Sequence, residues 1–545
     1  MLRVALAGLV FLGVSSAPLF AEQTCQGLMN IALEHATITF ATAVPEGPVS
    51  GGGRGGPPVN APAHCAVQGI IRPTKDSEIH FELWIPASGW NGKYLQLGNG
   101  GWAGAINAAG LAEPVKRGYA AAATDDGHQA EAPIKGASQG GAGATWAIGH
   151  PEKLVDFGYR AVHETNLQSK AIIRDLFGRA PSRSYFNGCS DGGREALMEA
   201  QRYAEDFDGI IAGAPASDWS HLFTGFIWNA RALTETPGSA IPPAKLSVIQ
   251  KAVLAECDAA DGVKDGLLQD PRACRFDPSV LTCKGAEGPQ CLTAPQVEAL
   301  RKIYEGPKNP RTGAPIFLGY ARGTEAGPAG WSLWIAPASV TSSIQYGFGS
   351  SYYGQAVFED PKWDYRNLNF DTDVAFGDQK AGPVLNATNP DLRSFRANGG
   401  KLIQYHGWGD PAISPLSSIA YYDSVRAFLD KFPDARHQGS SSTQEFYRLF
   451  MVPGMGHCGG GVGANSFGNG ASAQTDSDHD VISALDRWVE TGVAPDKIIA
   501  AGTVVGDTSK ALTRPLCPYP QVARYDRTGD PNNAASFACV APQVP

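Results

Sequence analysis

The first half of the chain alternates between segments with the apolar pattern of a strand and segments with that of a helix. In residues 79–86, apolar and polar side chains alternate and are followed by a continuous apolar run, and in residues 151–176 apolar side chains recur near helical spacing. Such an alternation of strands and helices is typical of α/β proteins with a mostly parallel sheet. The predicted strands here are residues 79–86, 93–97, 184–187 and 209–212, and the predicted helices are residues 151–176 and 193–203.

The same pattern returns far downstream, at residues 401–405 and 445–452. Between the two blocks, residues 217–398 are rich in Cys, Gly, Trp and Tyr. We therefore expect residues 217–398 to be an insertion folded over the sheet. Residues 22–216 and 399–545 would then form one α/β domain.

The first 21 residues have the three-part layout of a secretory signal peptide. One Arg precedes an apolar run at residues 4–14, and small residues lead to Ala21, after which we predict cleavage. An apolar run of this length is too short for a membrane-spanning helix, which needs about 20 residues. The sequence predicts a protein that is secreted or periplasmic and not anchored in a membrane.

Composition narrows the classes of partner. The chain has 545 residues, with Lys+Arg 44 against Asp+Glu 53 and a formal net charge of −9, which argues against nucleic acid as a partner. A hydrophobic fraction of 43% with 18% charged residues is typical of a folded protein. The length predicts at least two packed regions, and the sequence does not indicate an oligomeric state.

Ten cysteines follow the predicted signal peptide. An even number in an exported chain indicates disulfides, and a structural zinc site is disfavoured because no C-x-x-C pair is present. The cysteines are residues 25, 65, 189, 257, 274, 283, 291, 458, 517 and 539.

Ser190 is the candidate nucleophile. It is the centre of the G-x-S-x-G segment at 188–192, between a predicted strand and a predicted helix, which is the context of a nucleophile elbow. Ser138 is the centre of a second G-x-S-x-G segment, but no apolar strand precedes it. We therefore expect Ser190 to be the nucleophile and Ser138 to lie in a loop.

The candidate acid and base also follow predicted strands. Asp410 lies in a Gly-rich turn after residues 401–405, and His457 lies in another after residues 445–452. The order Ser, Asp, His is that of α/β-hydrolases. His406 is the closest rival to His457, but we expect it to pack beneath the Asp410 turn.

Two cysteines stand next to these residues: Cys189 precedes Ser190, and Cys458 follows His457. A Cys189–Cys458 disulfide would hold the two turns together, because bonded cysteines have Cα atoms within about 7 Å. In the alternative, each cysteine pairs with a nearer neighbour or stays free.

With these motifs the chain resembles the tannase and feruloyl esterase family, which includes mono(2-hydroxyethyl) terephthalate hydrolases. The resemblance implies an α/β-hydrolase fold with a large lid between the nucleophile and acid segments, and catalysis by Ser190, Asp410 and His457. It also implies disulfides 25–65, 257–274, 283–291 and 517–539. The motifs are GCSDGG at 188–193, HGWGDP at 406–411, GMGHCGG at 454–460, HPEK at 150–153 and DFGYRA at 156–161.

The resemblance further implies a structural calcium ion in the lid. Its ligands would be the carboxylates of Asp258, Asp261 and Asp265 and the carbonyls of Val263 and Leu267, which are the hard oxygen donors that Ca²⁺ prefers. Without the resemblance, this segment would be interpreted as a pair of Asp-Gly turns.

The expected chemistry is two-step acyl transfer with an oxyanion held by backbone N–H groups of Asp191 and Gly101. Ile413 lies where the resemblance suggests a wall of the acyl pocket. Arg322 is the one cation considered for holding a free carboxylate, without support from a motif. The aromatic residues expected to shape the pocket, or else the lid core, are Trp331, Trp334, Tyr346, Phe348, Tyr352 and Tyr353.

The sequence thus predicts a small-molecule ester substrate with an aromatic acid, feruloyl or galloyl ahead of the terephthalate monoester. Three alternatives stay open at this stage. They are a terephthalate monoester hydrolase, a non-catalytic exported binding protein with this fold, and a serine peptidase or acyltransferase with the same three residues.

Overall fold

The structure is a computed structural model that describes residues 24–49, 58–130, 143–327, 330–432, 441–470 and 474–542, without the side chains of 441 and 442. The predicted signal peptide and Ser138 lie outside these residues. Within the described ranges, no helix combines the length and apolar character needed to span a membrane.

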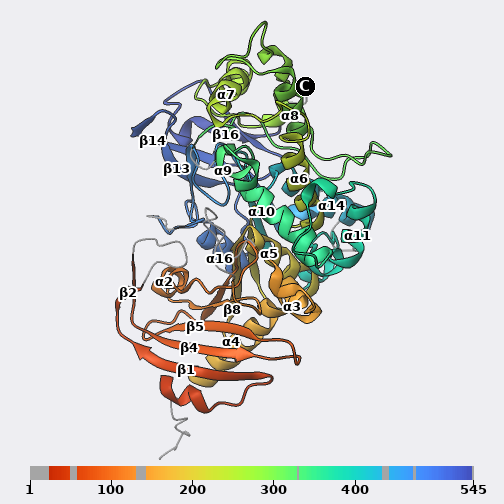
Figure 1. Ribbon diagram of the computed structural model, residues 1–545. Coiled ribbons are helices and arrows are strands. Elements are labelled where there is room, and N and C mark those ends of the chain that lie inside the picture. The colour runs from red at the N-terminus through yellow and green to blue at the C-terminus, as the bar shows by residue number, and fades with distance from the viewer. Residues whose placement is uncertain are drawn as a thin grey trace, which may run out of the picture.

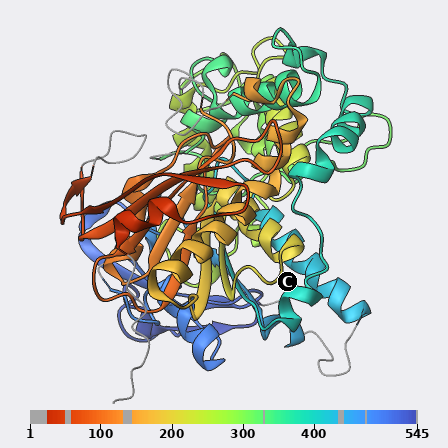
Figure 2. The same ribbon diagram turned by 90° about the horizontal axis from the view of Figure 1, so that it is seen from below.

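A nine-stranded sheet forms the centre of the fold, in the order β1-β4-β5-β7-β6-β8-β9-β10-β11. Strands from β7 through β11 in this order run parallel, and β1, β4 and β5 join them antiparallel at one edge (Figures 1 and 2). The strands are β1 (Ala36–Val44), β4 (His64–Ile71), β5 (Ile79–Pro86), β6 (Lys93–Leu97), β7 (Ala120–Thr124), β8 (Arg183–Cys189), β9 (Gly209–Gly213), β10 (Lys401–Gly407) and β11 (Tyr447–Val452).

Helices cover both faces of this sheet. On one face, α4, α5 and α14 pack their apolar side chains against the strands, and on the other face α2 and α16 do so. Every residue of β7 and β9 is buried, as expected for strands that helices cover on both faces. These helices are α2 (Ala108–Lys116), α4 (Ala161–Phe177), α5 (Asp191–Arg202), α14 (Pro415–Lys431) and α16 (Val481–Thr491).

The segment between β9 and β10 is helical and has its own core. In Figure 1, α7 and α8 lie at the end of the molecule opposite β1, β4 and β5. The apolar core of this segment also contains Trp102 and Phe157 from the sheet domain. The lid boundaries at 217 and 398 stay a prediction. The helices are α6 (Trp219–Ala232), α7 (Pro243–Cys257), α8 (Ala294–Glu305), α9 (Trp331–Trp334), α10 (Ile344–Ser351), α11 (Thr372–Lys380), α12 (Gly382–Leu385) and α13 (Arg393–Ala397).

Smaller elements complete the fold. The helical segment predicted at 151–176 consists of α3 (Pro151–Val155), the π-helical turn η3 (Asp156–Arg160) and α4. A short helix, α15 (Ser441–Gln444), precedes β11. The remaining strands are β2 (Gly47–Val49), β3 (Val59–Ala61), β12 (Gly463–Ser466), β13 (Ile498–Val504), β14 (Asp507–Leu516), β15 (Val522–Tyr525) and β16 (Phe537–Val540).

All ten cysteines are paired, in the four pairs that the resemblance implied and in the Cys189–Cys458 bond predicted from the residues beside Ser190 and His457. The disulfides are Cys25–Cys65, Cys189–Cys458, Cys257–Cys274, Cys283–Cys291 and Cys517–Cys539. The Cys189–Cys458 bond spans a sequence separation of 269, so it joins the end of β8 to the turn after β11.

Candidate active site

Ser190 occupies a sharp turn between β8 and α5. Its φ is 68° and its ψ is −119°, a left-handed conformation that is costly for a residue with a Cβ. The turn also requires glycine nearby, because a Cβ added at Gly188 would lie 2.4 Å from the carbonyl oxygen of Gly192. The sequence G-x-S-x-G therefore allows this tight turn, which places the serine at the start of a helix.

Ser190, His457 and Asp410 form one chain of hydrogen bonds. The His457 Nε2 lies 2.9 Å from the Ser190 Oγ, and the His457 Nδ1 lies 2.8 Å from the Asp410 Oδ2. The Trp334 ring and the imidazole make a T-shaped contact at a centroid distance of 5.3 Å and an interplanar angle of 69°. The predicted residues thus meet although they come from three distant turns.

Asp410 is buried and held from several sides. Its Oδ1 accepts N–H bonds from Ala412 at 2.7 Å and Ile413 at 3.0 Å, and its Oδ2 lies 3.1 Å from the His406 Nε2. Burial by itself would raise the pKa of Asp410. The interactions with His457 and His406 outweigh burial and hold that pKa below its ordinary value, so Asp410 is ionised at neutral pH.

His406 lies beneath the Asp410 turn, where the sequence analysis expected it. The ring is fully buried, and its Nδ1 lies 2.7 Å from the Ser418 Oγ. Its Nε2 also lies 3.2 Å from the Ile413 carbonyl oxygen. His406 and His457 therefore contact the same oxygen of Asp410, and His406 has no hydrogen bond to Ser190 among the described residues.

The loop at 98–101 lies beside the nucleophile turn. Gly101 and Asp191 both line the pocket that contains Ser190 and His457. Asp191 is the first residue of α5, so its N–H has no acceptor within the helix. The two predicted oxyanion donors are thus in one place, at the positive end of a helix dipole.

Glu195 fixes this loop, a role that the sequence analysis missed. Its Oε2 accepts the N–H of Asn99 at 3.1 Å, and the Asn99 carbonyl accepts the N–H of Gly192 at 2.9 Å. The loop is therefore bound to α5 at two points. The signal in the sequence was a carboxylate on the predicted helix four residues after Asp191, on the same helix face.

Asp126 and Glu195 form a buried pair of acids next to the loop. One oxygen of each, together with one of Asp191, lies within 4.8 Å of the others. Burial raises the pKa of Asp126 to about 7, and burial followed by the charge of Asp126 raises the pKa of Glu195 well above its ordinary value. Arg194 is also buried, and its Nε donates to the Asp191 Oδ1 at 2.6 Å. The pair is therefore suited to sharing a proton at neutral pH.

An aromatic and aliphatic pocket surrounds Ser190 and His457. Among the described residues that line it, none is Lys or Arg. Ile413 is one of its walls and is 3% exposed. The lining residues are Gly101, Ser190, Asp191, Ala216, Trp219, Leu222, Phe223, Phe226, Trp334, Ile344, Phe348, Ala412, Ile413 and His457.

Only part of the predicted aromatic set lines this pocket. Trp334 and Phe348 do so, whereas Trp331, Tyr352 and Tyr353 are buried in the lid core. Tyr346 packs edge-on against Tyr365 instead. Cores favour large apolar side chains as strongly as pockets do, so aromatic clustering alone does not distinguish the two.

The apolar face of α6 also lines the pocket, which was not predicted from the sequence. Trp219, Leu222, Phe223 and Phe226 recur at helical spacing and all line the pocket. Arg322, considered for holding a carboxylate, instead places its guanidinium over the Tyr304 ring at 4.7 Å and is not among the described pocket residues.

The predicted calcium ligands lie in one compact loop after α7. The Oδ1 of Asp258 accepts the N–H of Gly266 at 2.9 Å, and the Oδ1 of Asp261 accepts the N–H of Val263 at 3.0 Å. Burial raises the pKa of Asp261 to about 6, and the charge of Asp265 adds to this. The guanidinium of Arg514 lies 2.6 Å from the Asp265 Oδ2.

The sheet order, the nucleophile elbow and the placement of Ser190, Asp410 and His457 after strands define an α/β-hydrolase. The family model for tannase and feruloyl esterase matches residues 65–540, and the chain belongs to this family. It is therefore a carboxylic ester hydrolase, which removes the binding-protein and peptidase alternatives.

Individual relatives agree with this assignment. An esterase of Xanthomonas campestris pv. campestris, described as uncharacterized, is 43% identical over 99% of this chain and 95% of its own length. The mono(2-hydroxyethyl) terephthalate hydrolase of Piscinibacter sakaiensis is 34% identical over 88% of this chain and 85% of its own. The crystal structure of feruloyl esterase B from Aspergillus oryzae has a TM-score of 0.83 at 27% identity and covers 95% of this chain and 99% of its own.

Proposed function

We propose that this chain hydrolyses esters of aromatic acids, with Ser190 as nucleophile, His457 as general base and acid, and Asp410 as the residue that orients His457. The observation that carries the proposal is the Ser190–His457–Asp410 chain of hydrogen bonds, which opens onto a pocket of aromatic and aliphatic side chains. The fold alone would leave the substrate open.

The first half of the reaction forms an acyl-enzyme. His457 Nε2 takes the proton of the Ser190 hydroxyl as the Oγ attacks the ester carbonyl carbon. The N–H groups of Asp191 and Gly101 would bind the resulting oxyanion. When the intermediate collapses, the carbon–oxygen bond to the alcohol breaks, and protonated His457 gives its proton to the leaving oxygen.

The second half repeats these steps with water. His457 takes a proton from water, the hydroxide attacks the acyl carbon, and the proton returns to the Ser190 Oγ as the acid leaves. Asp410 accepts the Nδ1–H of His457 throughout, which leaves Nε2 as the acceptor toward Ser190 and stabilises the imidazolium.

The pocket favours a neutral aromatic acyl group. Offset and edge contacts between aromatic rings contribute about 0.5–1.5 kcal/mol each beyond area burial, and Phe223, Phe226 and Phe348 offer such rings. Since no Lys or Arg is among the described lining residues, a carboxylate on the acyl ring would be desolvated without a partner. Ile413, as an aliphatic wall, would leave room for a bulky phenolic acid.

Two terephthalate esters that differ in charge test this selectivity. We expect kcat/KM for neutral bis(2-hydroxyethyl) terephthalate to exceed that for the anionic monoester by at least about 10-fold, since each 1.4 kcal/mol of lost binding costs a factor of ten. Methyl ferulate and methyl gallate should also be better substrates than the monoester. Steady-state kinetics on the four esters measure this.

A second candidate activity is hydrolysis of the terephthalate monoester itself. The observation in its favour is the 34% identity to the relative named mono(2-hydroxyethyl) terephthalate hydrolase. A monoester turned over as efficiently as the diester and methyl ferulate would favour this candidate and contradict the selectivity argued from the uncharged pocket.

We also propose that the lid loop binds a structural Ca²⁺ through Asp258, Asp261, Asp265 and the carbonyls of Val263 and Leu267. The donors are oxygen atoms of the kind that Ca²⁺ prefers, and burial, helped by the charge of Asp265, raises the pKa of Asp261 to about 6. Bound Ca²⁺ would neutralise this charge and link the loop to the Cys257–Cys274 disulfide.

Chelation by EDTA should therefore lower the Tm of the protein by about 2–3 °C, since a ligand present at about 100 times its Kd contributes about 2.7 kcal/mol and the entropy of unfolding of a 545-residue chain is about 1.1 kcal/mol/K. Ca²⁺ added back should restore the Tm, as measured by differential scanning fluorimetry. Asp261→Asn should abolish the calcium-dependent shift, whereas Asp277→Asn, which removes an exposed lid carboxylate, should retain it. An Asp261→Asn variant with an unchanged shift would exclude this loop as the site.

Finally, we propose that the protein acts outside the cytoplasm, in the periplasm or the medium. The five disulfides support this, since such bonds persist in oxidising compartments.

A further inference from the structure

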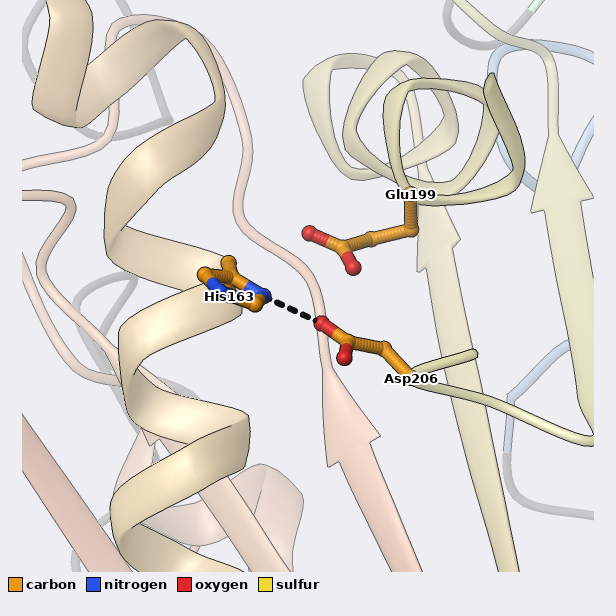
Figure 3. Close-up of side chains that lie close together, drawn as sticks. All are labelled: His163, Glu199 and Asp206. Carbon is orange, nitrogen blue, oxygen red and sulfur yellow. Dashed lines mark hydrogen bonds and ion pairs between the residues drawn. The ribbon is translucent and has the colours of Figure 1, made fainter. Parts of the chain in front are cut away.

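Three side chains near the C-terminal end of α5 converge on one point. His163 comes from α4, Glu199 from α5, and Asp206 from the turn between α5 and β9 (Figure 3). One nitrogen or oxygen from each residue lies within 4.8 Å of the other two, and the His163 Nδ1 lies 2.6 Å from the Asp206 Oδ2. The three therefore present one imidazole and two carboxylates to a common centre.

Glu199 is the unusual member of this cluster. It is 1% exposed, and both of its carboxylate oxygens are buried without a hydrogen-bond partner among the described residues. Figure 3 shows its carboxylate extending from α5 toward His163 and Asp206. Burial, followed by the charge of Asp206, raises the pKa of Glu199 well above its ordinary value. A buried carboxylate without a partner is costly, and a bound cation would remove that cost.

The surroundings hold the cluster in place. The ring of His163 stacks on Tyr203 at a centroid distance of 3.8 Å and an interplanar angle of 8°, which fixes the direction of its nitrogens. The nearby ammonium group of Lys170 donates to the backbone carbonyl of Asp206. Lys170 is thus held by the backbone, and the Asp206 Oδ2 is directed toward His163.

We propose that His163, Glu199 and Asp206 bind a divalent transition-metal ion of the Zn²⁺ type. Imidazole together with carboxylates suits Zn²⁺ and its first-row neighbours, whereas Ca²⁺ takes oxygen ligands only. Glu199 lies in the last turn of α5, where the helix dipole places partial negative charge that favours a cation.

The other buried acid cluster, around Asp126 and Glu195, has a different donor set. Of its three members none is a histidine, and Arg194 already supplies a cation to it through Asp191. Both carboxylate oxygens of Asp126 also lack a hydrogen-bond partner among the described residues, so the choice between the two clusters depends on the imidazole and on Arg194.

The metal would join three parts of the scaffold that supports the nucleophile. It would tie α4 to α5 and to the chain entering β9, while Glu199 lies about 12 Å along α5 from Asp191 at 1.5 Å per residue. The ion would therefore stabilise the helix that begins after Ser190 without contacting the substrate.

The proposal can be tested by measuring metal binding to the full chain. Excess Ca²⁺ is present throughout, so that the proposed calcium site in the lid loop stays occupied. We expect Co²⁺ to give a visible absorption spectrum with nitrogen and oxygen ligation, Zn²⁺ to displace it, and Zn²⁺ to raise the Tm. Glu199→Gln should weaken Zn²⁺ binding by at least about 10-fold, because loss of an outer-sphere partner alone typically costs about that much. Isothermal titration measures the affinity.

His221 provides the matched control. It also contacts two aspartates, Asp218 and Asp378, but through opposite ring nitrogens, so these groups do not converge. His221→Gln should leave Zn²⁺ binding unchanged, and His163→Gln should weaken it as Glu199→Gln does. His163 has a side chain that is 21% exposed, so its variant remains informative if Glu199→Gln does not fold. Equal Zn²⁺ affinity in the wild type, Glu199→Gln and His163→Gln would overturn the proposal.

Discussion

Replacing Ser190 with alanine should lower kcat for methyl ferulate by about four to six orders of magnitude, the range found when a nucleophile or its base is removed from such a triad. The physical reason is that, in the proposed mechanism, Ser190 Oγ forms the bond to the acyl carbon and His457, whose Nε2 lies 2.9 Å from this oxygen, activates it. His457→Ala should cost a similar factor. These residual rates can be measured by monitoring the release of ferulate chromatographically over several hours.

Two serine variants serve as controls for this result. Ser182→Ala removes an exposed hydroxyl just before β8 that bonds only the Gly92 carbonyl among the described residues, and it should leave kcat unchanged. Ser138→Ala removes the second G-x-S-x-G serine and should also have no effect. If Ser190→Ala retained full turnover and Ser138→Ala did not, the assignment of the nucleophile would be wrong.

Removing the Cys189–Cys458 disulfide should have the second largest effect. In the double variant Cys189→Ala/Cys458→Ala, we expect kcat to fall by about 100-fold, because a misplacement of about 1 Å between reacting groups has that cost. The bond holds the residues next to Ser190 and His457 at a Cα–Cα distance of 5.9 Å. Loss of a cross-link across 269 residues should also cost about 5 kcal/mol of stability. Kinetics and denaturant unfolding measure the two effects.

The matched control is the lid disulfide Cys283–Cys291, which closes a short loop with a sequence separation of 8. Its double alanine variant should lose about 2–3 kcal/mol by the same chain-entropy relation and keep its kcat. Equal loss of kcat in both double variants, or loss in neither, would contradict the view that the Cys189–Cys458 bond positions the catalytic groups.

Much of the sheet could be predicted from the sequence. The strands predicted at 79–86 and 93–97 have the bounds of β5 and β6, and those at 209–212 and 401–405 lie within β9 and β10. Such strands are short apolar runs that end at Gly-rich turns, so they can be recognised from neighbouring residues in the sequence. Ser190, Asp410 and His457 could be predicted in the same way, because each lies in a turn that follows such a strand.

The surroundings of the triad could not be predicted in the same way. Glu195 and Asp126 meet across a sequence separation of 69, and the α6 residues reach the pocket only because the lid packs on the sheet domain. The lid aromatics show the same limit, since Trp331 and Trp334 stand on one short helix yet only Trp334 reaches His457. These contacts depend on packing between distant segments.

The central claim is that the acyl group is transferred to the Ser190 Oγ, and active-site phosphonylation tests it most directly. A fluorophosphonate reacts with an activated serine, whose oxygen replaces fluoride at phosphorus, and mass spectrometry of the intact protein and its peptides locates the product. We predict one phosphonyl group per chain, on the peptide that contains Ser190, with loss of esterase activity in proportion and no reaction in His457→Ala. Labelling of a different residue that abolishes activity, or full labelling of Ser190 with undiminished ester hydrolysis, would contradict the account.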